Sequence, residues 1–222
     1  MYLVRTPRIL QKICPGLTWR MPADTRTLYL TFDDGPIPEV TPWVLEQLRA
    51  YRAKATFFCV GENVERHPDI LAQVLAEGHS IGNHTHKHLN GLKTGSHSYH
   101  QDVARCAQVL DTDLFRPPYG KLRPTQLKHL QQQYRIVMWD VLSGDFDSAI
   151  TAERCYRNIV DHAREGSIVV LHDSLKAAPH LRVVLPRVLS FFAERGFAFE
   201  AIPYRTFDSL RTSVPALYAE RA

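Results

Sequence analysis

The sequence predicts an α/β fold in which about seven parallel strands close, or nearly close, into a barrel. Three observations support this fold class. The chain has 222 residues, 45% of them hydrophobic and 23% charged, which suits one large globular domain. Apolar runs alternate with helical patterns from residue 27 to residue 203, as expected for a parallel sheet with crossover helices. Unusual polar residues follow five of the apolar runs, where α/β barrels carry their active sites.

The expected strands are short runs of aliphatic, β-branched and aromatic residues that end at glycine, proline or a polar cluster. They are residues 27–32, 55–60, 79–83, 114–116, 135–139, 167–171 and 198–202. The expected helices have start signals such as Thr41-Pro42 and stop signals such as Gly78. They are residues 41–51, 68–77, 98–110, 124–132, 151–164 and 180–195.

Residues 1–26 are expected to form a basic N-terminal arm, followed by one domain over residues 27–222. The arm has five basic residues and one acidic residue, so it carries the whole formal net charge of +4. The rest of the chain is neutral, which argues against nucleic acid as a partner. The apolar residues of the arm, which include Trp19, leave two alternatives. The arm packs on its own domain, or it makes a peripheral contact with an anionic membrane.

The arm also bears on the location of the protein. It lacks the apolar core of roughly 7–15 residues that a signal peptide needs. No run of about 18 apolar residues, long enough to span a membrane, occurs in the chain. We therefore expect the protein in the cytoplasm or at the surface of the cytoplasmic membrane.

Two adjacent carboxylates, Asp33 and Asp34, stand at the end of the first expected strand, before Gly35-Pro36. Neighbouring carboxylates repel each other unless a positive group lies close by or one of them is protonated. A metal ion bound to one carboxylate would relieve the repulsion and leave the other free. An ordinary strand-to-turn junction is the alternative, because Asp and Gly are common in turns.

The segment after the third expected strand is rich in histidine. On a helical turn, His84 and His88 would face the same side and share a cation, while His86 would point elsewhere. Two histidines and one carboxylate are a common ligand set for a catalytic divalent metal, and Asp34 is a good third ligand. The alternative is a polar loop that is merely rich in histidine.

Taken together, these motifs resemble those of the polysaccharide deacetylases, the NodB-homology group. Thr31-Phe-Asp-Asp-Gly35 resembles the first motif of that family and His84-Thr-His-Lys-His88 the second. Arg116-Pro-Pro-Tyr119 resembles the third motif and Leu171-His172 the fifth. The resemblance covers nearly all of residues 27–203. It implies a distorted (β/α) barrel and metal-assisted hydrolysis of an N-acetyl, or similar N-acyl, group on a sugar.

The resemblance also implies roles for the site residues. Asp33 is the expected general base and His172 the expected general acid. Asp34, His84 and His88 are the expected ligands of a divalent metal. Zn²⁺ suits this set best, although Co²⁺, Ni²⁺ or Mn²⁺ could bind the same ligands.

Two residues of the third motif are expected to assist the reaction. Arg116 would pair with Asp33 and stabilise its negative charge, although the same contact could be a purely structural salt bridge. The backbone N–H of Tyr119 would help to hold the oxyanion, since Pro117 and Pro118 have no N–H. For His172, the alternative to general acid is a histidine that is only hydrogen-bonded at the end of the barrel.

The fourth motif departs from the family pattern. Gly144-Asp145-Phe146 stands where the family usually has an Asp-Trp pair. Asp145 matches the acidic position that orients and tunes the catalytic histidine. Phe146 keeps the apolar face of the usual Trp but lacks its indole N–H. We expect Phe146, Pro117 and Leu171 to line the substrate pocket, and activity to be retained.

The predicted function is therefore metal-dependent removal of an N-acyl group from an amino sugar. The substrate would be an oligosaccharide, a polysaccharide or a lipid-linked precursor. Two alternatives remain: a metal-dependent esterase of small acyl esters, and a catalytically silent carbohydrate-binding barrel. The presence of both Asp33 and His172 argues against the silent barrel, because a decayed enzyme should have lost one of them.

Overall fold

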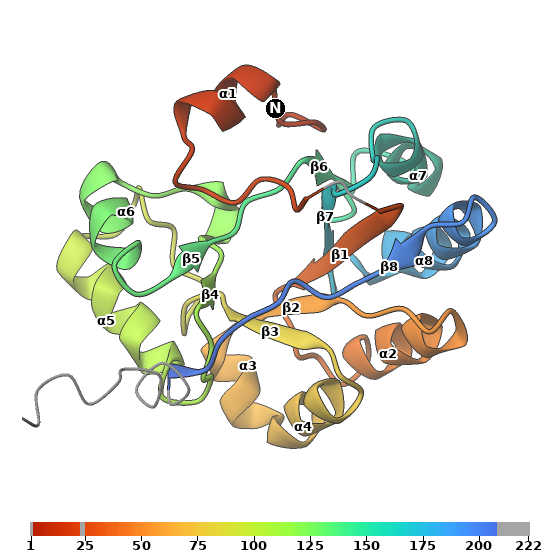
Figure 1. Cartoon of the computed structure of the whole chain (residues 1–222). Coiled ribbons are helices and arrows are strands. Elements are labelled where there is room, and N and C mark those ends of the chain that lie inside the picture. Colours follow the sequence, from red (N-terminus) through yellow and green to blue (C-terminus); the bar gives the residue numbers. More distant parts are fainter. Residues whose placement is uncertain (1, 23–24, 208–222) are drawn as a thin grey trace, which may run out of the picture.

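In the part of the chain that the structure describes, eight short strands form a curled parallel sheet with helices around its outer face (Figure 1). The computed structural model describes residues 2–22 and 25–207. Parts of the expected arm and domain lie outside the described residues, namely 1, 23–24 and 208–222. The division between residues 26 and 27 therefore stays a prediction.

The strands are short, and the helices follow them in alternation. The strands are β1 (Thr27–Asp33), β2 (Thr56–Cys59), β3 (Ser80–Asn83), β4 (Leu114–Phe115), β5 (Arg135–Ile136), β6 (Val141–Leu142), β7 (Ile168–His172) and β8 (Ala198–Phe199). The helices are α1 (Arg8–Ile13), α2 (Thr41–Ala50), α3 (Gly61–Arg66), α4 (Pro68–Ala76), α5 (Ser96–Cys106), the 3₁₀ turn η1 (Pro118–Gly120), α6 (Pro124–Leu130), α7 (Ala152–Val160) and α8 (Ala178–Ala193).

Strand β1, with seven residues, is the longest strand of the sheet and lies in its interior. Its neighbours are β7 on one edge and β2 on the other, and the strand order is β5-β4-β3-β2-β1-β7-β6. Within the described residues, no ladder joins β5 to β6. The sheet is thus a distorted half-barrel, which confirms the predicted fold class. The two end strands of the described sheet, β5 and β6, do not pair with each other, so strand pairing does not close the barrel.

The last predicted strand, 198–202, is shorter than expected, and it lies beside the start of β1. A closed barrel would place it between β7 and β1, whereas β8 pairs with the start of β1 on the side of β2. Phe199 accepts a backbone hydrogen bond from Lys54, just before β2. Beyond β8, the buried side chain of Ile202 packs among inner residues of the sheet, such as Phe58.

Four of the described elements were not predicted: α1, α3, the 3₁₀ turn η1 and β6. Strand β6 has two residues and helix α3 has six. Elements this short contain too few residues to show the periodicity of a strand or a helix.

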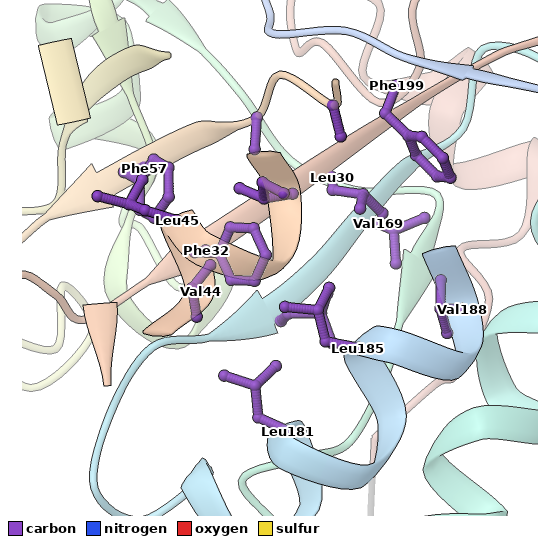
Figure 2. Packing of buried hydrophobic residues seen from close by; sticks show 14 of the residues in the cluster. Leu30, Phe32, Val44, Leu45, Phe57, Val169, Leu181, Leu185, Val188 and Phe199 are labelled. Atoms are coloured by element: carbon purple, nitrogen blue, oxygen red, sulfur yellow. The ribbon is translucent and has the colours of Figure 1, made fainter. Parts of the chain in front are cut away.

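Alternate residues of β1 face opposite sides of the sheet, as the pleat of a strand requires. Leu30 and Phe32 point outward, into a hydrophobic core that Leu185 and other residues of α8 complete (Figure 2). Thr31 and Asp33 point inward, where both contact the buried Arg116. The hydrophobic face of β1 therefore anchors the strand, and its polar face supplies the site.

The described part of the N-terminal arm packs against the open seam of the barrel. Around Thr18 the arm pairs in parallel with the chain that continues β5, and around Arg5 it pairs antiparallel with β6. Figure 1 shows the arm running across the top of the sheet, with α1 beyond it. Trp19 is buried in a hydrophobic cluster under α6. None of the described helices is long and apolar enough to cross a bilayer.

Truncation of Leu185 to Ala should destabilise the protein by about 2–5 kcal/mol, because this side chain is fully buried in the outer core. The matched control is Val183→Ala on the same helix, where the side chain is 46% exposed and the expected change is below about 0.5 kcal/mol. Urea unfolding followed by circular dichroism measures both. Similar effects of the two substitutions would contradict the packing of α8.

Candidate active site

The strand register brings the predicted base and acid together. In the parallel pairing of β1 with β7, Asp33 lies directly beside His172. Both residues are the last of their strands, so they reach the carboxyl end of the barrel. The predicted position of the site at this end follows from the strand order.

The turn after β1 is held by a residue for which the sequence suggested no role. Asp173 accepts hydrogen bonds from the N–H of Gly35 at 3.0 Å and from the hydroxyl of Thr41 at 2.6 Å. A Cβ atom on Gly35 would lie 2.0 Å from Oδ2 of Asp173, so only glycine fits this approach. Asp34 has a left-handed φ of 83°, which turns it away from the strand. Asp173 therefore fixes the turn that separates the two adjacent carboxylates.

The histidine segment does not form the helical turn that the sequence suggested. Residues 84–88 are an irregular loop in which Thr85 and His88 have left-handed φ angles of 64° and 53°. Asp102 accepts hydrogen bonds from the backbone N–H groups of His86 and Lys87 and so holds the loop. The two rings of His84 and His88 still meet, with centroids 5.0 Å apart. The pairing was predicted correctly, but from the wrong local geometry.

Asp34, His84 and His88 converge on one point. Their possible ligand atoms all lie within 4.8 Å of one another. Oδ1 of Asp34 is 3.2 Å from Nε2 of His88 and 3.8 Å from Nε2 of His84. This oxygen is buried and has no hydrogen-bond partner among the described residues, which fits a metal-ligand atom.

The electrostatics of these groups also fit a metal. Burial is the main reason that the pKa of His84 falls to about 4, and its Nδ1 donates a 2.8 Å hydrogen bond to the carbonyl of Arg116. His84 is thus neutral at pH 7, with the lone pair of Nε2 available. Burial would raise the pKa of Asp34, but His88, His172 and His84 outweigh it and hold that pKa well below its usual range. An ionised carboxylate and a neutral imidazole are the forms that bind a metal.

His86 faces away from this set, as predicted. Its ring is buried, and Nε2 lies 3.6 Å from Oε2 of Glu65 on α3. It contributes no atom to the cluster of ligands.

Arg116 is fully buried and holds Asp33. One guanidinium nitrogen, Nη1, donates to Oδ1 of Asp33 at 2.6 Å and to the hydroxyl of Thr31 at 2.7 Å. Its Nε and Nη2 donate to the carbonyls of Val137 and Met138. Because these partners fix the guanidinium, Asp33 can rotate little. Its other oxygen, Oδ2, lies 4.0 Å from Nε2 of His84.

Asp145 holds His172 in the same way. Its carboxylate accepts from Nδ1 of His172 at 2.7 Å and from the backbone N–H of His172 at 2.8 Å. Burial opposes a charge on His172, but the carboxylates of Asp145, Asp34 and Asp33 outweigh it and raise the pKa of His172 to about 9. His172 therefore carries a proton at neutral pH.

These groups line a cavity of about 560 Å³. Its walls are Tyr2, Asp33, Asp34, His84, His88, Pro117, Tyr119, Gly120, Lys121, Trp139, Leu142, Phe146, Val170, His172, Ser174 and Lys176. Pro117 and Phe146 thus line the cavity, as predicted, and the ring of Phe146 packs edge-on against that of His172 at 5.1 Å. The ring of Tyr119 packs similarly against His88 at 4.7 Å.

The prediction that Leu171 lines the pocket is wrong. Leu171 is fully buried in the outer hydrophobic core. Its neighbours Val170 and His172 face the opposite side of β7 and line the cavity. The alternation of a strand explains the difference, because a residue adjacent to an inward histidine must point outward.

The sequence did not identify Tyr2 as a wall of the cavity. Its ring packs against Phe146 at 5.2 Å, and its hydroxyl donates to Asp147. Burial and Asp147 raise the pKa of Tyr2 to about 12, so it remains a neutral phenol. No local motif marks this residue, because its contacts depend on the arm folding back across the barrel. Lys176, whose Nζ lies 5.9 Å from the centre of the Phe146 ring, was missed as well.

Comparisons with known proteins identify the family. Residues 20–137, more than half of the chain, match the family described as "Polysaccharide deacetylase". The chain belongs to the polysaccharide deacetylase family. The motifs that resembled this family are those that form the cavity.

Similar members of the polysaccharide deacetylase family cover most of the chain. A peptidoglycan-N-acetylglucosamine deacetylase of Bacillus cereus is 34% identical over 193 residues, which cover 84% of this chain and 91% of that protein. A chitooligosaccharide deacetylase of Azorhizobium caulinodans is 32% identical over 212 residues, which cover 85% of this chain and 98% of that protein. The crystal structure of the Bc1960 peptidoglycan N-acetylglucosamine deacetylase has a TM-score of 0.81 at 29% identity, covering 89% of this chain and 95% of that one. The roles of the individual residues in this chain stay predictions.

Removal of a metal ligand should abolish tight Zn²⁺ binding. For Asp34→Asn and His84→Ala we expect the affinity for Zn²⁺ to fall by more than about 100-fold. Mutation of residues that only hydrogen-bond to zinc ligands already lowers metal affinity by about 10–100-fold. Titration against a chromophoric chelator measures the affinity. Asp33→Asn is the matched control and should keep the metal. If it lost Zn²⁺ as fully as Asp34→Asn, the assignment of the two carboxylates would be wrong.

Proposed function

We propose that this member of the family removes the N-acetyl group from an amino-sugar residue of a carbohydrate, with a divalent metal held by Asp34, His84 and His88. The observation that carries the proposal is that this ligand set shares one cavity with an acid and a base. Asp33 and His172 stand beside the set, and each is fixed by a buried partner of opposite charge. The metal that suits two imidazoles and one carboxylate best is Zn²⁺, with Co²⁺, Ni²⁺ and Mn²⁺ as alternatives.

An N-acetylglucosamine-containing oligosaccharide or polysaccharide is the proposed substrate class. The relatives named for peptidoglycan and chitooligosaccharides support this class. The cavity suits a sugar because its wall includes aromatic rings with apolar faces, among them the 59% exposed Tyr119. A lipid-linked precursor stays a predicted member of the class.

Asp33 is the proposed general base. It stands next to the ligand set without belonging to it, and Arg116 orients it. When bound, a divalent ion polarises the amide carbonyl and lowers the pKa of water from 15.7 towards ~7. Asp33 accepts the proton of the attacking water through Oδ2, the oxygen that Arg116 does not bind.

Tyr119 and His172 complete the proposed reaction. The N–H of Tyr119 is the first after Pro117 and Pro118, and it would donate to the oxyanion. Tyr119 has a left-handed φ of 61°, a strained conformation that is typical of functional sites. His172 donates its proton to the leaving amine, which would otherwise depart as a strong base.

Acetate release from chito-oligosaccharides of graded length tests the proposed function. The Zn²⁺-loaded protein should release acetate, and mass spectrometry should show products that have lost acetyl groups. Asp33→Asn should lower kcat by about 10²–10⁴-fold with the metal retained, because the base is lost.

Other outcomes of this assay identify the alternatives. Turnover of small acyl esters without turnover of any amide would indicate an esterase. Binding of the sugars without any turnover would indicate a silent barrel. Full activity after complete removal of the metal would refute the role of the ligand set.

The pH dependence of kcat/KM tests the positioning role of Asp145. His172 must be protonated to act as the acid, so activity should fall as pH rises through its pKa. Asp145→Asn removes the main charge that raises this pKa, and the alkaline limb should move to lower pH by about 1–3 units. The control is Asp161→Asn, an exposed carboxylate at the end of α7, which should leave the profile unchanged. An unshifted alkaline limb in Asp145→Asn would exclude His172 as the group that titrates there.

A further inference from the structure

The N-terminal arm exposes an unusual number of apolar side chains. Helix α1 buries none of its residues. Ile9 and Ile13 are 65% and 68% exposed, and Leu3, in the chain before α1, is 63% exposed. With Leu10, they are four of the ten large hydrophobic side chains that the described residues expose. We call these four residues the apolar arm surface. It has no partner in the described part of the chain to account for it.

A second cavity, of about 540 Å³, adjoins the apolar arm surface. Its walls are Arg5, Thr6, Pro7, Arg8 and Arg164, and we call it the arginine cavity. Three arginines thus line one open depression of the surface. Clustered arginines are typical of sites that bind an anion. The N–H donors of a guanidinium group are spaced to hydrogen-bond two oxygens of a phosphate.

The charges around the arginine cavity are not balanced. Asp140 lies 3.9 Å from Nε of Arg164, but it is also 3.2 Å from Nε of Arg20. Asp140 already accepts hydrogen bonds from Ser167 and Gln11. One carboxylate therefore faces several guanidinium groups.

Arg164 itself has unused donors. Its Nε and Nη2 are buried and have no hydrogen-bond partner among the described residues. Burial, Arg20 and Arg5 lower the pKa of Arg164, which shows how crowded the positive charges are. The positive charge of Arg164 is therefore poorly compensated, and an anion in the arginine cavity would be attracted to it.

The two features suggest the same partner. A protein partner with an apolar surface would explain the apolar arm surface but would leave the arginines of the cavity without an anion. A nucleic acid would explain the guanidinium groups but not the exposed isoleucines. An anionic bilayer has both phosphate headgroups and an apolar interior, and basic amphipathic segments bind at its surface.

We propose that the apolar arm surface and the arginine cavity form a docking site for an anionic phospholipid bilayer. Ile9, Ile13 and Leu3 enter the boundary of the acyl chains, and the arginines bind headgroup phosphates. The arm also carries Tyr2, which lines the catalytic cavity. Tyr2 and Arg8 are six residues apart and at most ~22 Å from each other. Docking would therefore hold the catalytic cavity close to the bilayer.

Co-sedimentation with vesicles tests this proposal independently of enzymatic activity. The full chain should bind vesicles of phosphatidylglycerol and phosphatidylcholine in equal parts and bind pure phosphatidylcholine at least about tenfold more weakly. Binding should weaken as salt rises. Equal binding to both compositions, or to neither, would overturn the proposal. So would binding of inorganic phosphate without binding of vesicles.

Two pairs of variants localise the site. Ile9→Ser with Ile13→Ser should reduce vesicle binding at least about tenfold by removing apolar area. Arg5→Gln with Arg8→Gln should remove most of the preference for phosphatidylglycerol. Both pairs should keep the acetate release and thermal unfolding of the parent protein, because none of these side chains lines the catalytic cavity.

Matched controls make the same changes at residues outside the arm and the arginine cavity. Leu75→Ser with Val183→Ser alters apolar side chains that are 40% and 46% exposed on α4 and α8. Arg66→Gln with Arg157→Gln alters arginines that are 60% and 59% exposed. Figure 1 shows α4 on the opposite side of the molecule from α1. If the controls weakened binding as much as the arm variants, there would be no specific docking site. If the isoleucine pair only abolished self-association of the protein, the apolar arm surface would be an interface between copies of the chain.

Discussion

The contacts of Arg116 hold the candidate active site together. This residue is fully buried, and its guanidinium lies over the ring of Phe58 at 4.0 Å while it donates to Asp33. Its own carbonyl accepts the hydrogen bond that fixes the tautomer of His84. One residue thus orients both the proposed base and a proposed metal ligand. Breaking such a buried pair by removing one partner typically costs ~3–5 kcal/mol, because the other charge stays buried without compensation.

The position of Arg116 depends on an open barrel. A barrel closed by eight equal strands would fill its interior with apolar layers. Here the short strands β4 and β5 leave the carbonyls of Val137 and Met138 free to accept from the guanidinium. The arm pairs with the exposed edges beside β5 and β6, which removes a site for edge-to-edge association. The arm also adds Tyr2 to the cavity, so the same segment closes the fold and completes the site.

The sequence predicted most of the site because its residues belong to compact motifs. Asp33, Asp34, His84 and His88 lie at the ends of parallel strands, and such ends meet at one edge of a sheet by geometry. The loop that carries His84 and His88 could not be predicted in detail, because its left-handed residues are held by Asp102, a partner on α5. Tyr2 was missed because its position follows from long-range packing.

The errors in the fold have related causes. Leu171 was assigned to the pocket from its place in a motif, although the two-residue period of a strand turns it outward. The segment 198–202 carries the pattern of a strand, but only Ala198 and Phe199 form β8. The strand pattern predicts no strand order, because that order depends on the packing of the whole chain. Here β7 pairs along one edge of β1, while β2 and β8 share the other edge.

Anomalous X-ray diffraction at the zinc edge, from crystals of the Zn²⁺-loaded protein, would locate the metal relative to the two adjacent carboxylates. We expect one strong peak within about 2.0–2.2 Å of Oδ1 of Asp34 and of Nε2 of both His84 and His88, with Asp33 outside the coordination sphere. A peak at another position, or one in which Asp33 replaces Asp34 as the ligand, would contradict this ligand assignment.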